Sequence, residues 1–309
     1  MLILPDVSRA LESDQYMTWG RELRDVSSEL NTHVNQTIEK ALEELAGEKK
    51  AVSCAKAHNF AVKKFRGFIV HKIESWLEED LGDDLYPQAN MSYPDYFTIS
   101  IYNYQYSAVG RFFPMGRNLN YNGVILGSDK LAHFISTGLR YFNVFQAAKK
   151  KGLSDEKAEQ KAIRYGISLE RSYLGLWPSG VFSWGDLEAN YQGLQMNRRF
   201  CDGDRPYLTQ DAEGHWRLAN LIDMGDFLNP YMDETFNPSF FGALKWLKVK
   251  PMLLKYCARK STPEVAGRMD YYKSIAIKSY NIRYLEELAA AGDRSIPNRE
   301  RQYLSAICK

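Results

Sequence analysis

The sequence predicts an α+β fold that is predominantly helical and contains a small β-hairpin. Apolar residues recur every three or four positions over long segments, which is the period of an amphipathic helix. Only short stretches alternate apolar and polar residues between turn-forming Gly and Pro, as strands do. The 309 residues are 45% hydrophobic and 25% charged, and no linker rich in Gly, Ser or Pro interrupts them. We therefore expect one continuous body with a large core.

Two helices are expected to form a hairpin within residues 1–90. An apolar stripe predicts the first helix over 17–45, and Gly47 is placed to end it. A second stripe predicts a helix over 52–81. Residues 91–309 are then expected to form a helical core that carries the β-hairpin and ends in C-terminal helices.

The core is expected to begin with a β element. Residues 93–106 alternate apolar and polar side chains, which predicts a strand. Ser128 is a suitable N-cap for a helix over 128–151, and an acid-rich first turn predicts a further helix over 154–170.

Turn-forming residues follow that helix. They predict a short β-hairpin over 177–183, after which Ser183 or Asp186 can cap another helix. Residues 198–239 show little periodicity and are expected to be rich in loops. Helical periodicity returns over 240–308.

Charge and hydropathy argue against a nucleic-acid partner and against a membrane-spanning segment. The 40 basic and 38 acidic residues are well mixed and give a formal net charge of +2, so we expect no nucleic-acid partner. No apolar run approaches the roughly 18 residues of a membrane span, so we expect no transmembrane segment. We also expect the protein to be a monomer. The N-terminus lacks a basic region and a full apolar core, so it does not read as an intact signal peptide.

Four cysteines leave two interpretations open. They contain no C-x-x-C pair, which argues against a zinc knot or a thioredoxin-type motif. Their even number allows two disulfides in an exported protein, with three possible connectivities, and equally allows four buried thiols in a cytosolic one. The four are Cys54, Cys201, Cys257 and Cys308.

Glu170 and Asp186 are the candidate catalytic carboxylates. Glu170 falls at the edge of an apolar face in the last turn of its helix, where desolvation raises a carboxyl pKa, as a general acid requires. Two facing carboxyl groups are the machinery of most glycosidases. The alternative is that Glu170 pairs with Arg164 or Arg171 and that Asp186 only caps a helix.

A second candidate arrangement involves a metal. Asp129 and His133 stand one helical turn apart, and with Glu170 they could bind one ion. The alternative is a capping Asp beside a hydrogen-bonded His. The aromatic strip over 230–241, which includes Tyr231, could line a sugar groove or form a packed loop.

The order of these features resembles the catalytic core of the lysozyme superfamily. A long helix ends in Glu170, a short hairpin follows over 177–183, and Asp186 comes next. The resemblance implies a lysozyme-like helical body in which Glu170 is the general acid and Asp186 the second carboxylate.

The motif letters are also similar to those of VanZ-like proteins and related bacterial envelope proteins. The chain has D-K-x-x-H-F at 129–134, a later Glu, and D-L-x-A-N-x-x-G at 186–193. This resemblance implies an association with the bacterial envelope. It also implies that five side chains form one polar cluster: Asp129, His133, Glu170, Asp186 and Asn190.

Together these patterns predict an exported, periplasmic or secreted bacterial glycoside hydrolase. We expect a lysozyme-like muramidase that cleaves peptidoglycan and needs no metal or other cofactor, with Glu170 protonating the glycosidic oxygen and Asp186 stabilising the oxocarbenium-like state. Four further residues are expected to contact the sugar or to orient the carboxylates: Tyr173, Ser183, Asn190 and Tyr231.

Two other functions remain open. One is a non-catalytic envelope or glycan-binding protein that keeps the polar cluster as a structural network. The other is a metal-dependent hydrolase that uses Asp129, His133 and Glu170.

Overall fold

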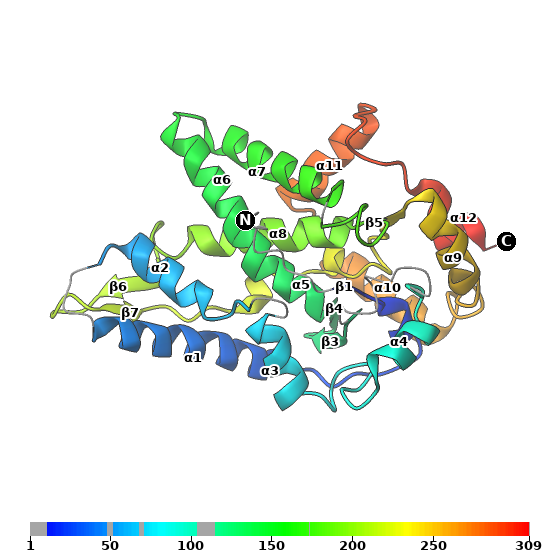
Figure 1. Cartoon of the computed structure of the whole chain (residues 1–309), viewed down its shortest axis with the longest axis horizontal. Coiled ribbons are helices and arrows are strands. Elements are labelled where there is room, and N and C mark those ends of the chain that lie inside the picture. The colour runs from blue at the N-terminus through cyan, green and yellow to red at the C-terminus, as the bar shows by residue number, and fades with distance from the viewer. Residues whose placement is uncertain (1–10, 48–51, 68–70, 104–114, 173, 309) are drawn as a thin grey trace, which may run out of the picture.

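The computed structural model describes residues 11–47, 52–67, 71–103, 115–172 and 174–308. This part of the chain is mostly helical, and its short strands form two-stranded pairs. The predicted predominantly helical α+β fold is therefore confirmed. Figure 1 shows α6 and α7 at the top of the molecule and α1 with the β6–β7 pair at the lower left, with α8 between these two groups.

The elements follow one another with these bounds. The helices are α1 Ser27–Ala46, α2 Cys54–Lys63, α3 Lys72–Asp80, α4 Tyr93–Ile99, α5 Ser128–Ala132, α6 Gly138–Lys150, α7 Asp155–Glu170, α8 Trp184–Arg198, α9 Ala243–Leu254, α10 Pro263–Ile275, α11 Tyr280–Ala290 and α12 Leu304–Ile307. The strands are β1 Leu11–Ser13, β2 Met115–Gly116, β3 Asn118–Tyr121, β4 Val124–Gly127, β5 Val181–Phe182, β6 Leu208–Gln210, β7 Trp216–Leu218 and β8 Phe240–Phe241.

The N-terminal helices differ from the prediction. The first begins at Ser27, because the chain before it forms a 3-10 turn over Gln15–Thr18 and an extended segment in which Asp25 bridges to Asn120. The expected second helix is two helices, α2 and α3. The Glu74 carboxylate accepts a hydrogen bond from the backbone N–H of His71 (3.0 Å), which starts α3 as a separate helix.

The predicted strand at residue 93 is wrong, since Tyr93–Ile99 is helix α4. The Ser92 hydroxyl accepts a hydrogen bond from the Asp95 backbone N–H (3.3 Å), and Pro94 occupies the first turn. Both are favourable at a helix N-terminus. These local signals outweigh the short apolar and polar alternation. Residues 100–103 of the predicted strand form a bend and a turn, and 104–106 lie outside the described residues.

The predicted hairpin over 177–183 is also wrong. Val181 and Phe182 form strand β5, which pairs antiparallel with the distant β8. A two-residue hairpin does form at β3–β4, where Asn122 and Gly123 both have positive φ. Such φ values are what a type I′ turn requires.

One long helical segment crosses the molecule from Ser128 to Lys150. It consists of α5, a π-helical turn over His133–Thr137, and α6. The helix predicted over 128–151 is thus confirmed, although its N-cap is Gly127 and not Ser128. The π-helical turn is a local feature often found at functional sites.

Two glycines let α8 cross this segment closely. A Cβ added to Gly193 would stand 1.9 Å from the backbone oxygen of Phe134, and one added to Gly138 would stand 2.7 Å from the Gly193 Cα. Only residues without a side chain permit such an approach. The crossing sets His133 and Asn190 side by side.

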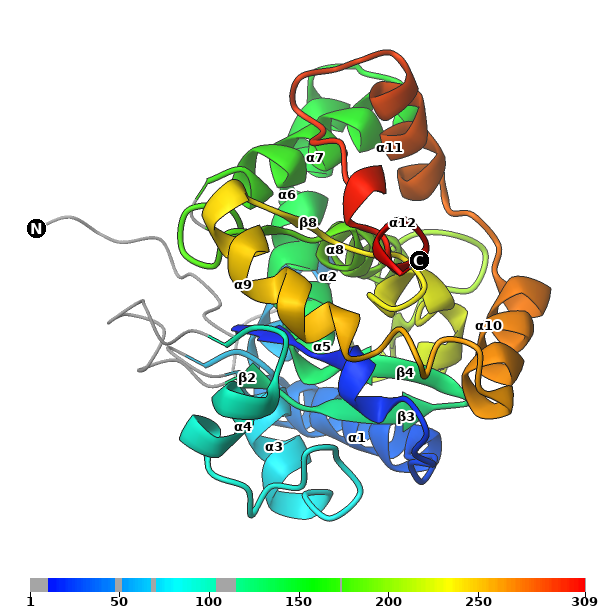
Figure 2. The ribbon, with the colours of Figure 1, turned by 90° about the vertical axis from the view of Figure 1, so that its right-hand side faces the viewer.

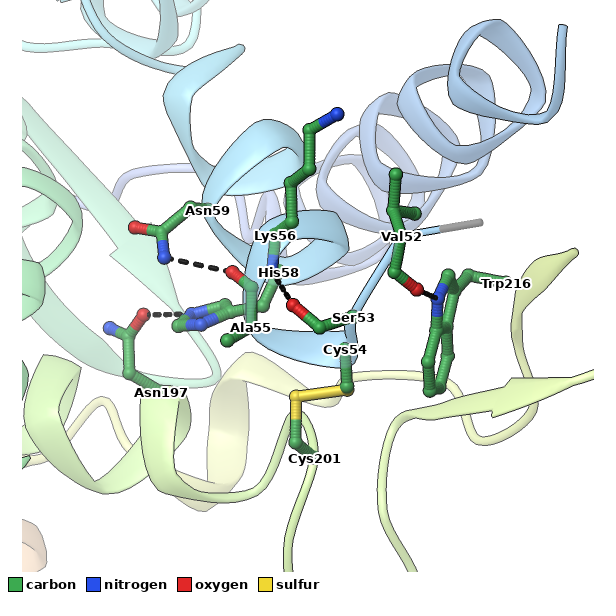
Figure 3. The surroundings of a disulfide bond; sticks show 10 residues. All are labelled: Val52, Ser53, Cys54, Ala55, Lys56, His58, Asn59, Asn197, Cys201 and Trp216. Atoms are coloured by element: carbon green, nitrogen blue, oxygen red, sulfur yellow. Dashed lines mark hydrogen bonds between the residues drawn. A yellow bond between two sulfur atoms is a disulfide. The ribbon is translucent and has the colours of Figure 1, made fainter. Parts of the chain in front are cut away.

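Two disulfides tie distant parts of the chain together. Cys54 pairs with Cys201, and Cys257 pairs with Cys308. Figure 3 shows the first bond joining the start of α2 to the chain just after α8, beside the buried pair of His58 and Asn197. Among the described residues, no helix is long and apolar enough to span a membrane.

Candidate functional site: a buried carboxylate cluster

Lys130 is fully buried and is surrounded by carboxylates. Its Nζ lies 2.8 Å from Asp129 Oδ2, 2.7 Å from Asp186 Oδ1 and 2.7 Å from Glu234 Oε1. Burial alone lowers the pKa of a lysine, but the three carboxylates outweigh it and raise the pKa of Lys130 well above its usual value. Lys130 is therefore charged and joins three acids that come from different parts of the sequence.

The hydroxyl of Ser183 connects two of these acids. It donates a hydrogen bond to Glu234 Oε1 (2.9 Å) and accepts one from the backbone N–H of Asp186 (3.0 Å). Ser183 thus caps α8 and at the same time holds Glu234. The Tyr102 hydroxyl donates to the other oxygen of Glu234.

The short strand β1 adds Glu12 and Ser13 to the cluster. Strand β1 pairs parallel with β2, which places it beside the start of α5. The Ser13 hydroxyl donates to Asp129 Oδ1, and Glu12 Oε1 accepts from the Ser179 hydroxyl (3.3 Å). Burial, together with the negative charge of Asp186, raises the pKa of Glu12 well above its usual value.

His133 faces both an amide and a carboxylate. Its Nδ1 lies 3.2 Å from Asn190 Oδ1, and its Nε2 lies 3.4 Å from Asp186 Oδ2. An amide oxygen only accepts, so Nδ1 carries the proton and donates to Asn190. In the neutral ring the Nε2 lone pair then points at a carboxylate oxygen. Two electron pairs at this distance repel each other unless a proton on Nε2 or a bound cation stands between them.

Glu170 is completely buried at the end of α7. Its Oε2 accepts from the Ser183 backbone N–H (3.4 Å), while its Oε1 has no hydrogen-bond partner among the described residues. Burial, followed by the charge of Asp186, raises the pKa of Glu170 well above its usual value. An unpaired buried carboxylate oxygen is costly, and either a proton or a bound cation relieves that cost.

The arginines near Glu170 in sequence do not pair with it. Arg164 binds Asp293 (3.1 Å), and Arg171 donates to the backbone oxygen of Arg294 (2.6 Å). The alternative in which an arginine neutralises Glu170 therefore does not describe this structure.

Two groups of side chains in the cluster have the spacing of metal ligands. One contains His133, Glu170 and Asp186, and the other contains Glu12, Asp129 and Asp186. Within each group the nearest ligand atoms lie within 4.8 Å of one another, and all the residues are buried. The metal triad expected from sequence is thereby changed, since Asp186 and not Asp129 accompanies His133 and Glu170.

The structure brings together most of the predicted site residues. Asp129, His133, Glu170, Asp186 and Asn190 form one polar cluster, and Ser183 belongs to it. Tyr173 lies outside the described residues. Tyr231 has its ring against Phe236, with 5.5 Å between ring centroids, and its backbone N–H donates to Asn229.

Sequence reasoning missed three charged members of the cluster: Glu12, Lys130 and Glu234. A weak signal existed for Lys130, because it is the second letter of the D-K-x-x-H-F string. Glu234 had been noted only as part of the aromatic strip over 230–241. Nothing in the sequence marked Glu12, since a parallel strand pairing brings it to the site.

Comparisons with known proteins leave the site to be interpreted from its own chemistry. No family model, no curated protein and no solved structure matches this chain.

Proposed function

We propose that this chain is a metal-dependent hydrolase whose ion is bound by His133, Glu170 and Asp186. The observation that carries the proposal is the approach of a histidine nitrogen and two carboxylates within 4.8 Å in a buried site. Histidine nitrogens and carboxylate oxygens are both ligands of catalytic zinc and related ions, and three protein ligands leave a position open for water or substrate.

The distances support this assignment. Ligand atoms about 2.1 Å from a tetrahedral zinc ion stand about 3.4 Å apart, and His133 Nε2 lies 3.4 Å from Asp186 Oδ2. A cation between these atoms would remove the repulsion of their lone pairs. The cation would also bind Glu170 Oε1, which has no hydrogen-bond partner among the described residues.

The second group of acids is less suited to an ion. Lys130 Nζ already lies within 2.8 Å of Asp129 and Asp186, and the Ser13 hydroxyl occupies the other oxygen of Asp129. The ammonium group supplies positive charge there. We therefore assign the ion to the group that contains His133.

The surrounding residues orient the three ligands. Asn190 holds the Nδ1 proton of His133, which directs Nε2 towards the ion, as outer-shell partners do in metal sites. Lys130 fixes one oxygen of Asp186, and the Ser183 N–H fixes one oxygen of Glu170. A bound ion supplies Lewis acidity and lowers the pKa of water. In the hydrolysis, water adds across the scissile bond, its hydroxyl going to the electrophilic atom and its proton to the leaving group.

Two disulfides support export to an oxidising compartment, the periplasm or the exterior. The envelope resemblance of the motif letters then makes peptidoglycan the first substrate to test. Access would come from the side of His133 and Glu12, each of which is 5% exposed, because Glu170 is not exposed at all.

A second candidate is the muramidase with Glu170 as general acid. The observation that favours it is that oxygens of Glu170 and Asp186 approach within 4.8 Å, close to the roughly 5 Å separation of the two carboxyl groups in a retaining glycosidase. In this proposal Asp186 is the second carboxylate and no ion takes part.

One experiment separates the two candidates. The full chain is loaded with Zn²⁺, dialysed, analysed for zinc and incubated with purified peptidoglycan before and after treatment with dipicolinate. We expect about one zinc ion per chain, and product release that the chelator abolishes and Zn²⁺ restores. New amino groups would identify amide cleavage, and new reducing ends would identify glycan cleavage.

Two variants serve as the matched controls. His133→Ala should lose both zinc and activity, whereas His58→Ala, which removes a buried histidine outside the cluster, should keep zinc. Full hydrolysis by zinc-free protein would contradict the metal proposal. If that hydrolysis produced reducing ends and disappeared in Glu170→Gln, it would establish the muramidase.

A further inference from the structure

A stretch of 29 residues in the C-terminal part of the chain contains no acidic residue. Between Thr235 and Pro263 there is no Asp or Glu, although the chain as a whole has 38 of them. The same stretch carries six basic residues: Lys245, Lys248, Lys250, Lys255, Arg259 and Lys260. Its local charge is therefore strongly positive in a chain that is otherwise nearly balanced.

Helix α9 lies within this stretch and exposes an apolar stripe. Leu244 is 83% exposed, Leu247 is 68% exposed and Leu254 is 43% exposed, and Pro251 is exposed between them. Their spacing of three, four and three residues places all four on one helical face, within an arc of about 80°.

The opposite face of α9 is firmly packed. Val249 and Leu253 are buried, and the Trp246 ring stacks on Phe241 with 6.0 Å between centroids. The exposed leucines therefore belong to a well-anchored helix and not to a loose end. Figure 2 shows α9 on the outside of the molecule, next to α12.

Exposed lysines flank the stripe on both sides. At 100° per residue, Lys248 lies about 40° beyond one edge of the stripe and Lys250 about 40° beyond the other. Lys255 continues the first row just after the helix, and both Lys250 and Lys255 are exposed. Leucines between two rows of cations are the pattern of a helix that lies in a membrane interface.

From this arrangement we infer that α9 docks the protein on an anionic lipid bilayer. The leucine stripe would enter the boundary between headgroups and acyl chains while the flanking lysines meet anionic headgroups. The helix has 12 residues, so it lies on the surface, because a spanning helix needs about 20. Charge complementarity argues for a lipid surface: the exposed Lys248, Lys250 and Lys255 beside the stripe match anionic headgroups, and the stretch contains no acid that would repel them. The inference is independent of the proposed hydrolase activity.

Co-sedimentation of the full chain with vesicles tests it. The vesicles are phosphatidylcholine alone, or phosphatidylcholine mixed with phosphatidylglycerol. We expect binding to the anionic vesicles to be about tenfold tighter than to the neutral ones, and to weaken as salt is raised.

Three variants assign the binding to this face. Leu244→Ser with Leu247→Ser, and separately Lys250→Glu with Lys255→Glu, should each weaken binding about tenfold or more. Leu221→Ser changes a leucine that is 72% exposed elsewhere and should bind like the parent. Circular dichroism of each variant checks that it is folded.

Three results would overturn the inference. The first is parent protein that stays in the supernatant when it is mixed with anionic vesicles. The second is equal binding of the parent protein to anionic and neutral vesicles. The third is a concentration-dependent dimer that the leucine double variant dissociates, because α9 would then be covered by a second copy of this chain.

Discussion

Two buried histidines face the same helix and differ in their surroundings. His133 contacts Asn190 of α8, and His58 contacts Asn197 of the same helix, seven residues later. Both asparagine oxygens accept from a ring nitrogen. Gly193 lies between the two asparagines, where α8 crosses the segment that carries His133.

The environment of His58 is apolar. Its ring packs against Phe142 and Phe200. Its Nε2 lies 2.5 Å from Asn197 Oδ1, and Figure 3 draws this hydrogen bond. Burial lowers the pKa of His58 to about 4, only partly offset by the bond to Asn197. This histidine is neutral and its role is structural.

The environment of His133 is acidic. Its second nitrogen faces Asp186 and Glu170, in a cluster where one lysine is set against five carboxylates. A His–Asn contact on a buried helix therefore does not by itself mark a functional site. The two histidines differ in what the second ring nitrogen faces. For His133 it faces a group of acids that a single lysine neutralises only in part.

The largest expected effect comes from Gly193→Ala, which acts on both histidines at once. The new methyl group would lie 1.9 Å from the Phe134 backbone oxygen, so α8 must move away from the helical segment. We expect the free energy of unfolding to fall by about 3 kcal/mol and zinc binding to be lost. Denaturant unfolding and zinc analysis measure the two. Gly203→Ala is the control for a glycine-to-alanine change without a steric clash, because a Cβ at this loop position meets nothing within 4 Å. Its φ of +98° means that this control also carries some backbone strain.

The next effect is the pH dependence of stability that His58 contributes. Its folded pKa of about 4 lies below the usual 6.5. Between these values the unfolded chain binds a proton that the folded chain does not, so stability falls as pH falls. This group should contribute a loss of about 3 kcal/mol between pH 7 and pH 4.

Subtracting the stability curve of His58→Ala from that of the parent isolates this contribution. Burial raises the pKa of Asp14 to about 6, so titration of this group changes the stability in the opposite direction. Its contribution is the same in both proteins and cancels in the difference. A difference that is flat over this pH range would show that His58 is not buried neutral.

The smallest effect separates the two asparagines. Asn190→Ala removes the acceptor that orients His133 and should weaken zinc affinity about tenfold to a hundredfold. Asn197→Ala leaves His58 unpaired and should lower the free energy of unfolding by about 1 to 3 kcal/mol with zinc affinity unchanged. Calorimetric zinc titration and denaturant unfolding of both variants measure this. Equal zinc affinities in the two variants would remove the distinction between the histidines.

Local signals allowed part of this structure to be predicted. Helices α7 and α8 are N-capped by Ser154 and Ser183, whose hydroxyls accept hydrogen bonds from the backbone N–H groups of Lys157 and Asp186, and the sequence predicts both helices. The β3–β4 hairpin was equally local, because Asn122-Gly123 is a strong turn signal, and it was overlooked.

Long-range pairing decided the rest. Strand β5 pairs with β8 some sixty residues later, so a local hairpin could not be told from a distant partner by composition. Glu12 and Glu234 reach Lys130 through a two-stranded pairing and an irregular segment, neither of which has a sequence period. Lys130 itself appeared to be only a neighbour of Asp129, because burial cannot be read from a single charged letter.

Anomalous diffraction from crystals soaked in Zn²⁺ would locate the ion that we assign to His133, Glu170 and Asp186. We expect one strong peak about 2.0 to 2.2 Å from His133 Nε2 and from one oxygen each of Glu170 and Asp186. The peak should be absent from His133→Ala crystals and present in His58→Ala crystals. A parent crystal with no peak at His133, or with its peak among Glu12, Asp129 and Asp186 instead, would contradict this assignment.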